Sequence, residues 1–306
     1  MRRVKEVRNL YVVESPLQLL CAFEKSFFQE NVTFVVRMNG NPANDNQILK
    51  VAKTLEIDVI KKVLRPSKIK LDSLKNIIFI IYLLVKFDTY YLGSYHSKLL
   101  AFLRRFINAK NIVLLDDGVA TLLAQKEMES HKRPYNIFTF FDLKPLPFQK
   151  IEKHSFQNLV KIFNIENKSK NGTYFIGQKV VEVGILSLDL YISIVGRAAK
   201  MAGADNLIYI PHRGESEVVI SRLKSIKGLE VRFIESPIEL YFISEKNPPV
   251  AIYSIISTAL NTLSIISKKT SFFALVPKCL SKTRVPHIEN IVQQLEKNSN
   301  IDVISI

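Results

Sequence analysis

The chain has 306 residues, of which 47% are hydrophobic and 23% charged, and its formal net charge is +15 at pH 7. This is an ordinary globular composition with an ample core, and it excludes a largely disordered chain. The length favours two domains over one. The two cysteines, Cys21 and Cys279, follow no pairing pattern, so we expect reduced thiols in a reducing compartment.

The strong positive charge suits an anionic partner, such as a nucleic acid, an acidic lipid surface or a negatively charged substrate. The lysines are scattered, however, and no RNA-binding signature with interleaved aromatic residues occurs. We therefore expect no nucleic-acid partner. A solvated lysine-rich surface explains the charge as well as attraction to a membrane does.

The N-terminus does not look like a signal peptide, because charged residues dominate 1–8 and no sustained apolar core follows. The most apolar stretch, 77–85, is far shorter than the ~20 residues needed to span a bilayer. These features predict a soluble cytoplasmic protein. Its basic residues offer a means of association with the cytoplasmic face of the inner membrane.

The first half of the sequence alternates between predicted strands and predicted helices. Short apolar runs predict strands at 9–13, 33–37, 58–63, 89–92 and 111–115. Helical periodicity occurs at 19–27, 47–55, 71–84 and 98–106, and Ser15 followed by Pro16 is a typical helix start. We expect a polar turn at 39–46 and a less regular stretch at 128–150.

A second alternation follows a hydrophilic linker at 166–172. Its predicted strands are 174–176, 207–210, 229–234 and 250–253, and its predicted helices are 186–201, 217–226, 238–244 and 257–263. The fold class is therefore α/β, with two Rossmann-like, doubly wound parallel-sheet domains that face each other across a cleft. We place the N-terminal domain at 1–168 and the C-terminal domain at 169–306.

The first candidate for chemistry is Asp116-Asp117-Gly118, which ends the apolar run 111–115. Ligands of open α/β sheets bind beyond the carboxyl ends of such strands. A carboxylate there can act as a general base, and its neighbour can hold it or nearby hydroxyls. The alternative is an ordinary Asp-Gly turn with a helix cap.

His212 and Arg213 follow the predicted strand 207–210 in the same way. An imidazole and a guanidinium at a strand end can neutralise a phosphate leaving group, with His212 as a proton donor. A lone histidine is also commonly structural.

Two later strand ends carry polar residues that suit a nucleotide. Ser254, Ser257 and Thr258 surround a strand-to-helix junction, which can cradle a phosphate or simply cap the helix. Glu235, Pro237 and Glu239 surround a helix start, where an acid can hold a ribose diol or interact with the helix dipole.

Two further strand-end loops could line the cleft, namely Gly177-Gln178-Lys179 and Gly93-Ser94-Tyr95-His96. No HExxH, CxxC pair, Walker loop or GxGxxG motif occurs, so the sequence gives no support for metal hydrolysis, P-loop or dehydrogenase chemistry. We expect no metal and no cofactor.

Taken together, these motifs resemble the bacterial sialyltransferases of the GT-B architecture, above all glycosyltransferase family 52 and the related capsule and O-antigen sialyltransferases. The matching segments are Asp116-Asp117-Gly118, Pro211-His212-Arg213, Pro237 with Glu239, Ser257-Thr258, and the opening Val13-Glu14-Ser15-Pro16-Leu17-Gln18. The resemblance spans most of the chain through short motifs. His212 is followed by arginine rather than the family's proline, and the Gly177 loop lacks the family's aspartate.

The resemblance implies an inverting, metal-independent transfer of sialic acid from CMP-sialic acid to a sugar hydroxyl of a surface oligosaccharide or glycolipid. Because the Gly177 loop lacks an aspartate, we assign the base to Asp117, or to its neighbour Asp116. The implied donor side contains His212, Arg213, Gly177, Gln178, Glu235, Pro237, Glu239, Ser254, Ser257 and Thr258. The implied acceptor side contains Ser15, Gln18, Ser94, His96 and Gly118. The alternatives are a transferase for another activated sugar and a non-catalytic nucleotide- or nucleic-acid-binding protein.

Overall fold

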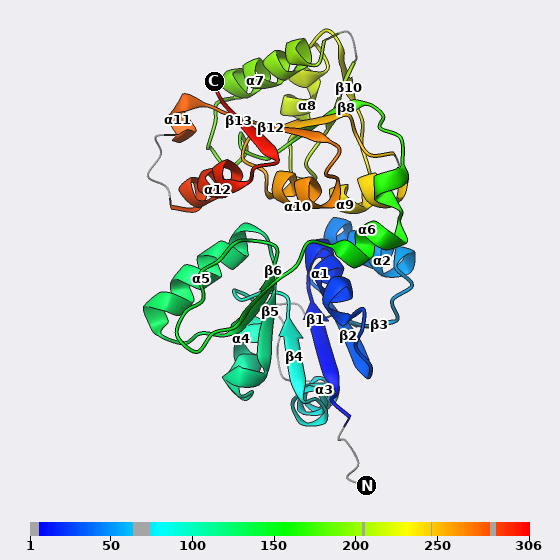
Figure 1. Cartoon of the computed structure of the whole chain (residues 1–306), viewed down its shortest axis with the longest axis vertical. Coiled ribbons are helices and arrows are strands. Elements are labelled where there is room, and N and C mark those ends of the chain that lie inside the picture. The colour runs from blue at the N-terminus through cyan, green and yellow to red at the C-terminus, as the bar shows by residue number, and fades with distance from the viewer. Residues whose placement is uncertain (1–5, 64–73, 204–205, 246, 282–285) are drawn as a thin grey trace. The chain divides into compact units, whose positions relative to one another are not determined.

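The computed structural model describes residues 6–63, 74–203, 206–245, 247–281 and 286–306. The chain divides into two compact α/β units, Met1–Asn158 and Leu159–Ile306 (Figure 1). This division falls within helix α6 (Gln157–Ile162), earlier in the chain than the hydrophilic linker on which the sequence-based domain boundary rests.

The N-terminal unit contains a seven-stranded parallel sheet in the order β3-β2-β1-β4-β5-β6-β7. Its strands are β1 Asn9–Val13, β2 Val32–Met38, β3 Val59–Val63, β4 Thr89–Leu92, β5 Ile112–Leu115, β6 Asn136–Thr139 and β7 Ile151–Lys153. The strand order reverses between β1 and β4. Such a topological switch point is where open α/β sheets bind their ligands.

Helices connect these strands, and most begin at a polar cap. They are α1 Pro16–Ser26, α2 Pro42–Thr54, α3 Leu74–Lys86, α4 Lys98–Arg104 and α5 Val119–His131. Ser15 caps α1 by accepting the Gln18 N–H, and Asn41 caps α2 by accepting the Ala43 and Asn44 N–H groups. The prediction of a polar turn at 39–46 is therefore wrong from Pro42 onward, because Asn41 and Pro42 start helix α2.

The sheet is buried because helices cover it, as a parallel sheet requires. On one face Leu10, Val12, Leu92 and Leu114 pack in a single cluster with side chains of α3, α4 and α5. Strand β6 lies within the stretch that the sequence predicted to be irregular, and its Ile137 belongs to the same cluster. The carboxyl ends of β1, β4 and β5 are thereby held side by side on a rigid support.

The C-terminal unit repeats this plan with a six-stranded parallel sheet in the order β10-β9-β8-β11-β12-β13. Its strands are β8 Thr173–Ile176, β9 Leu207–Ile210, β10 Leu229–Val231, β11 Ala251–Ser254, β12 Ser271–Val276 and β13 Ile301–Ser305. Its α-helices beyond the shared α6 are α7 Leu188–Met201, α8 Glu217–Leu223, α9 Ile238–Leu240, α10 Thr258–Ile266, α11 Lys278–Ser281 and α12 Pro286–Lys297. The switch point lies between β8 and β11.

The predicted fold class, two Rossmann-like doubly wound parallel-sheet domains, is confirmed by these two sheets. That the domains face each other across a cleft stays a prediction. Within the described residues, no helix combines the length and the apolar character needed to cross a lipid bilayer.

Candidate functional site

Asp117 is the second residue after β5, and predicted acceptor-side residues from the ends of β1 and β4 surround it. The Ser15 hydroxyl, after β1, is 3.5 Å from Asp117 Oδ1. The nearby side chains of Gln18, Ser94 and His96 each act to lower the pKa of Asp117. The structure thus brings these four residues and Asp117 together beside the switch point of the N-terminal sheet.

The environment of Asp117 suits a general base. The pKa of Asp117 is raised from 3.8 to about 6, mainly by burial and also by the negative charge of Glu14, while the side chains of Gln18 and Ser94 act in the opposite direction. The side chain nevertheless remains partly exposed. A carboxylate with a pKa near neutrality can both accept and release a proton at physiological pH.

Asp116 has a different role because it is completely buried. Its carboxylate accepts hydrogen bonds from the Thr139 hydroxyl, from the Gly118 N–H at 2.7 Å and from the Thr121 hydroxyl at 3.3 Å. Burial raises its pKa to about 7. These contacts fix the turn that presents Asp117, whose own N–H donates to Thr121 Oγ1 at 2.7 Å.

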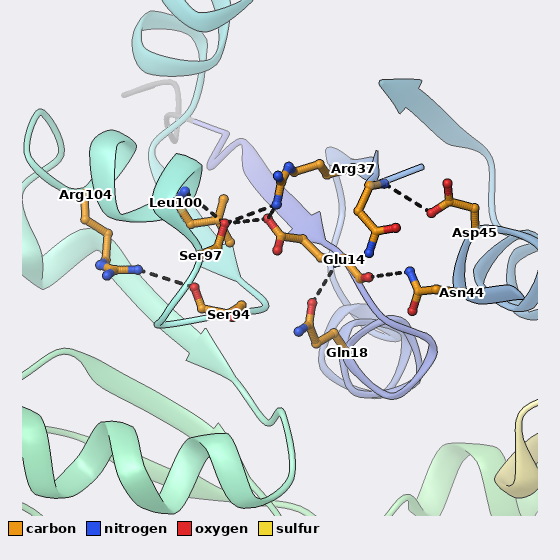
Figure 2. Close-up of polar contacts among 10 residues, drawn as sticks. Glu14, Gln18, Arg37, Asn44, Asp45, Ser94, Ser97, Leu100 and Arg104 are labelled. Carbon is orange, nitrogen blue, oxygen red and sulfur yellow. Dashed lines mark hydrogen bonds and ion pairs between the residues drawn. The ribbon is translucent and has the colours of Figure 1, made fainter. Parts of the chain in front are cut away.

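A buried ion pair at the ends of β1 and β2 adds residues that the sequence analysis did not select. Arg37 Nη1 lies 2.8 Å from Glu14 Oε1, and their side chains are only 7% and 13% exposed. The Ser97 hydroxyl donates to the same carboxylate at 2.7 Å, and Asn44 Nδ2 donates to the Glu14 carbonyl oxygen at 3.0 Å (Figure 2). This network fixes the backbone from which Ser15 and Gln18 extend.

Two of the predicted acceptor-side residues, His96 and Gly118, lie at the border of this cluster. His96 Nε2 pairs with Glu127 Oε1 at 3.0 Å, and both side chains are partly exposed. Gly118 is buried at the start of α5 with a φ of +65°, a conformation that favours glycine.

In the C-terminal unit, His212 follows β9 and its ring is oriented by its own loop. Its Nδ1 accepts the Gly214 N–H at 3.0 Å. Burial and the positive charges of Arg213 and Lys179 lower the pKa of His212. The imidazole is therefore neutral near pH 7, and this hydrogen bond assigns its proton to Nε2.

Glu215, which the sequence-based prediction did not include, anchors the His212 loop. Its carboxylate accepts the Tyr191 hydroxyl at 2.9 Å, the Tyr209 hydroxyl at 2.5 Å and the His212 N–H at 2.7 Å. Burial raises the pKa of Glu215 to about 7. A Cβ at Gly177 would lie 2.6 Å from Glu215 Oε2, so only glycine fits there without a shift.

The residues predicted to cradle a phosphate lie together at the switch point between β8 and β11, and phosphate binding there stays a prediction. Gln178 Oε1 accepts the Ile256 N–H at 3.0 Å, and the Ser254 hydroxyl donates to the Ile176 carbonyl oxygen at 2.8 Å. Ser257 caps α10 by accepting the Ala259 N–H at 3.2 Å, and Thr258 is the first residue of that helix. These residues form one loop cluster, and Ser257 does act as a helix cap.

The residues predicted to hold a ribose are more dispersed. Glu235 is exposed and Pro237 is buried. Glu239 is 8% exposed, and its carboxylate accepts the Thr262 hydroxyl at 3.0 Å, which ties α9 to α10. Burial raises the pKa of Glu239. Contact with a ribose stays a prediction for Glu235 and Glu239.

The described residues contain no group of three or more histidine, cysteine, aspartate or glutamate side chains that could hold a metal ion. No protein-family model matches the chain, and no curated protein matches it in sequence. Among solved structures, MurG of Acinetobacter baumannii aligns with a TM-score of 0.49 and 9% identity, over 98% of this chain and 86% of that chain. A glycosyltransferase from Rickettsia africae ESF-5 aligns with a TM-score of 0.49 and 12% identity, over 90% of this chain and 80% of that chain.

Proposed function

We propose that the chain is an inverting, metal-independent sialyltransferase that moves sialic acid from CMP-sialic acid to a sugar hydroxyl of a bacterial surface glycan, with terminal galactose as the expected acceptor. The observation that carries the proposal is the position and pKa of Asp117. Its carboxylate is partly exposed, lies beside a switch point, and has a pKa of about 6. The resemblance of the strand-end motifs to glycosyltransferase family 52 supports the choice of donor.

In the proposed reaction, Asp117 takes the proton of the acceptor hydroxyl while the hydroxyl oxygen bonds to the anomeric carbon of sialic acid. The bond from that carbon to the phosphate oxygen breaks, and its electron pair leaves with CMP. The configuration at the anomeric carbon inverts because the attack is a single displacement. Protonated Asp117 then releases its proton to solvent, which a pKa of about 6 allows.

The C-terminal domain would hold the leaving phosphate. A neutral His212 with its proton on Nε2 can donate a hydrogen bond to a phosphate oxygen, and Arg213 and Lys179 supply positive charge around it. The N-terminus of α10, in the loop cluster of Gln178 and Ser254, also favours an anion. Because these groups can neutralise the charge that develops on CMP, we propose a reaction that needs no metal or other cofactor.

The experiment is to incubate the purified full chain with CMP-sialic acid or with UDP-sugars, each with a galactose-terminated acceptor, and to measure nucleotide release. We expect CMP release that increases with the acceptor concentration. Turnover of a UDP-sugar alone would exclude CMP-sialic acid as the donor but would leave the assignment as a glycosyltransferase intact. No turnover of any donor, together with steeply salt-dependent binding of nucleic acid, would overturn the enzyme assignment.

The net charge of +15 supports a second part of the proposal, that the protein works at the cytoplasmic face of the inner membrane, where a glycolipid acceptor is presented. The measurement is co-sedimentation with vesicles. Binding to vesicles that contain anionic lipid, with loss at high salt, is expected. Equal recovery with anionic and neutral vesicles would contradict it.

A further inference from the structure

The hydroxyl of Tyr191 contacts two strand-end loops of the C-terminal unit. Tyr191 lies near the start of α7, and its side chain is fully buried. Its hydroxyl accepts the backbone N–H of Gln178, in the loop after β8, at 3.0 Å. The same hydroxyl donates to Glu215 Oε1, in the loop after β9, at 2.9 Å. One oxygen atom therefore joins both loops.

Each of these two partners continues the connection by one more hydrogen bond. Glu215 Oε2 accepts the His212 N–H at 2.7 Å. Gln178 Oε1 accepts the N–H of Ile256, in the loop between β11 and α10, at 3.0 Å. An unbroken series of hydrogen bonds thus runs from the loop that carries His212, through Tyr191, to the loop that leads into α10.

The centre of this series is tightly packed. The Tyr209 hydroxyl is 2.7 Å from the Tyr191 hydroxyl and 2.5 Å from Glu215 Oε1. A Cβ on Gly177 would lie 2.4 Å from the Tyr209 hydroxyl and 2.6 Å from Glu215 Oε2, so the first residue after β8 has to be glycine for these groups to keep their places. Close packing of this kind favours movement of the two loops as a unit.

We propose that Tyr191 is a positioning residue that keeps His212 and the start of α10 at a fixed separation. These are the two groups to which the proposed function assigns the donor phosphate, so the inference rests on that function. Because the Tyr191 side chain is fully buried, it offers no surface to the nucleotide and acts only through Gln178 and Glu215. Phenylalanine lacks only the hydroxyl, so Tyr191→Phe removes the link and retains the ring.

The first experiment measures amide hydrogen exchange of the full chain by NMR, without nucleotide. In Tyr191→Phe the Gln178 amide loses its acceptor and should exchange at least roughly twofold faster. We expect the His212 amide to exchange faster as well, although its own acceptor, Glu215, is still present. In Glu215→Gln the Gln178 amide should respond in turn. Tyr253→Phe, in β11 of the same sheet, is the matched control and should leave both amides unchanged.

The second experiment measures CMP binding by isothermal titration calorimetry. Tyr191→Phe should bind CMP roughly two- to tenfold more weakly, the effect of one lost hydrogen bond. If Tyr191 acts through His212, the same substitution should reduce CMP affinity by a smaller factor in the His212→Ala background than in the wild type. A tyrosine that only stabilises the domain would give the same factor in both backgrounds. Tyr253→Phe should bind CMP normally.

The two experiments separate this inference from the proposed function. An unchanged His212 amide in folded Tyr191→Phe would overturn the inference, and so would equal factors in the two backgrounds. Should Tyr191→Phe fail to fold, as judged by circular dichroism, Glu215→Gln decides, and an unchanged Gln178 amide there would overturn the inference. A wild type that binds no CMP overturns the proposed function instead, while amide exchange still tests the link between the two loops.

Discussion

The hydroxyl of Ser15 lies 3.5 Å from the carboxylate of Asp117, although 102 positions separate the two residues in the sequence. The contact exists because β4 pairs with both β1 and β5, so the three strands end at one edge of the sheet. Ser15, near the N-terminus, is thereby placed beside a carboxylate that comes much later in the sequence.

Replacing Asp117 by asparagine removes the proposed base with little change of shape. We expect Asp117→Asn to reduce sialic acid transfer by about a hundredfold to ten-thousandfold, the usual contribution of a general base. Asp142→Asn is the control, because its side chain is 86% exposed in the same domain. Steady-state transfer rates check the prediction, and a near-normal rate in Asp117→Asn would assign the base elsewhere.

The pH dependence of transfer should report the ionisation of Asp117. Its pKa is raised to about 6, and only the charged form can accept a proton. The rate should therefore rise with pH through about 6 and level off above it. A profile of kcat/KM against pH measures this limb. A rate that stays constant from pH 4 to pH 8 is not compatible with Asp117 as the base.

His212→Ala should weaken nucleotide binding rather than proton abstraction. One hydrogen bond to a charged phosphate contributes about 1.5–3 kcal/mol, so we expect CMP to bind roughly ten- to a hundredfold more weakly. Isothermal titration calorimetry with CMP measures the change. Asp117→Asn is the matched comparison and should bind CMP normally. Equal affinities in His212→Ala and the wild type would remove His212 from the phosphate site.

Glu215→Gln should loosen the loop that carries His212. Three donors converge on the Glu215 carboxylate, and glutamine offers only one oxygen, so at least one donor loses its partner. We expect the free energy of unfolding to fall by about 1–3 kcal/mol. Urea denaturation measures it, with Glu182→Gln as the control, because the exposed Glu182 accepts the Ser216 N–H and carries no such convergence of donors. Equal losses in both variants would contradict a special role for Glu215.

Asp116 should make stability depend on pH. Its pKa is 3.8 when exposed and about 7 when buried, so the folded state holds the proton more tightly than the unfolded state. Its contribution to the free energy of unfolding is complete below about pH 4 and is lost as the pH rises through about 7. The total loss is at most roughly 4 kcal/mol. Relative to the wild type, Asp116→Asn should gain stability over this interval. Urea denaturation at several pH values tests it, and a constant difference would refute it.

Much of the fold could be predicted because each central strand is a short apolar run that ends in a turn. The run before Asp116 and the run before Pro211 are fully or mostly buried strands, as expected. Strands β6, β7, β12 and β13 were not predicted. Of these, β7 and β13 lie at sheet edges, where the strand is very short or alternates with polar residues. The start of α2 was missed even though Asn41-Pro42 carries the same signal as Ser15-Pro16.

The candidate site could be predicted where a residue closely follows a strand. Asp117 and His212 each lie two positions after a strand end, and so do Ser15 and Ser94. Arg37 lies inside β2 and finds Glu14 only because β2 pairs with β1. Likewise, no local pattern indicates that Tyr191 and Tyr209 converge on Glu215, since that contact depends on the packing of α7 against the sheet.

The most direct test is a crystal structure of the full chain with CMP bound. We expect the phosphate within hydrogen-bond distance of His212 Nε2, next to the start of α10, with the Asp117 carboxylate near the position that the anomeric carbon of sialic acid would occupy. CMP bound away from the carboxyl ends of β8, β9 and β11, or a phosphate far from Asp117, would contradict it.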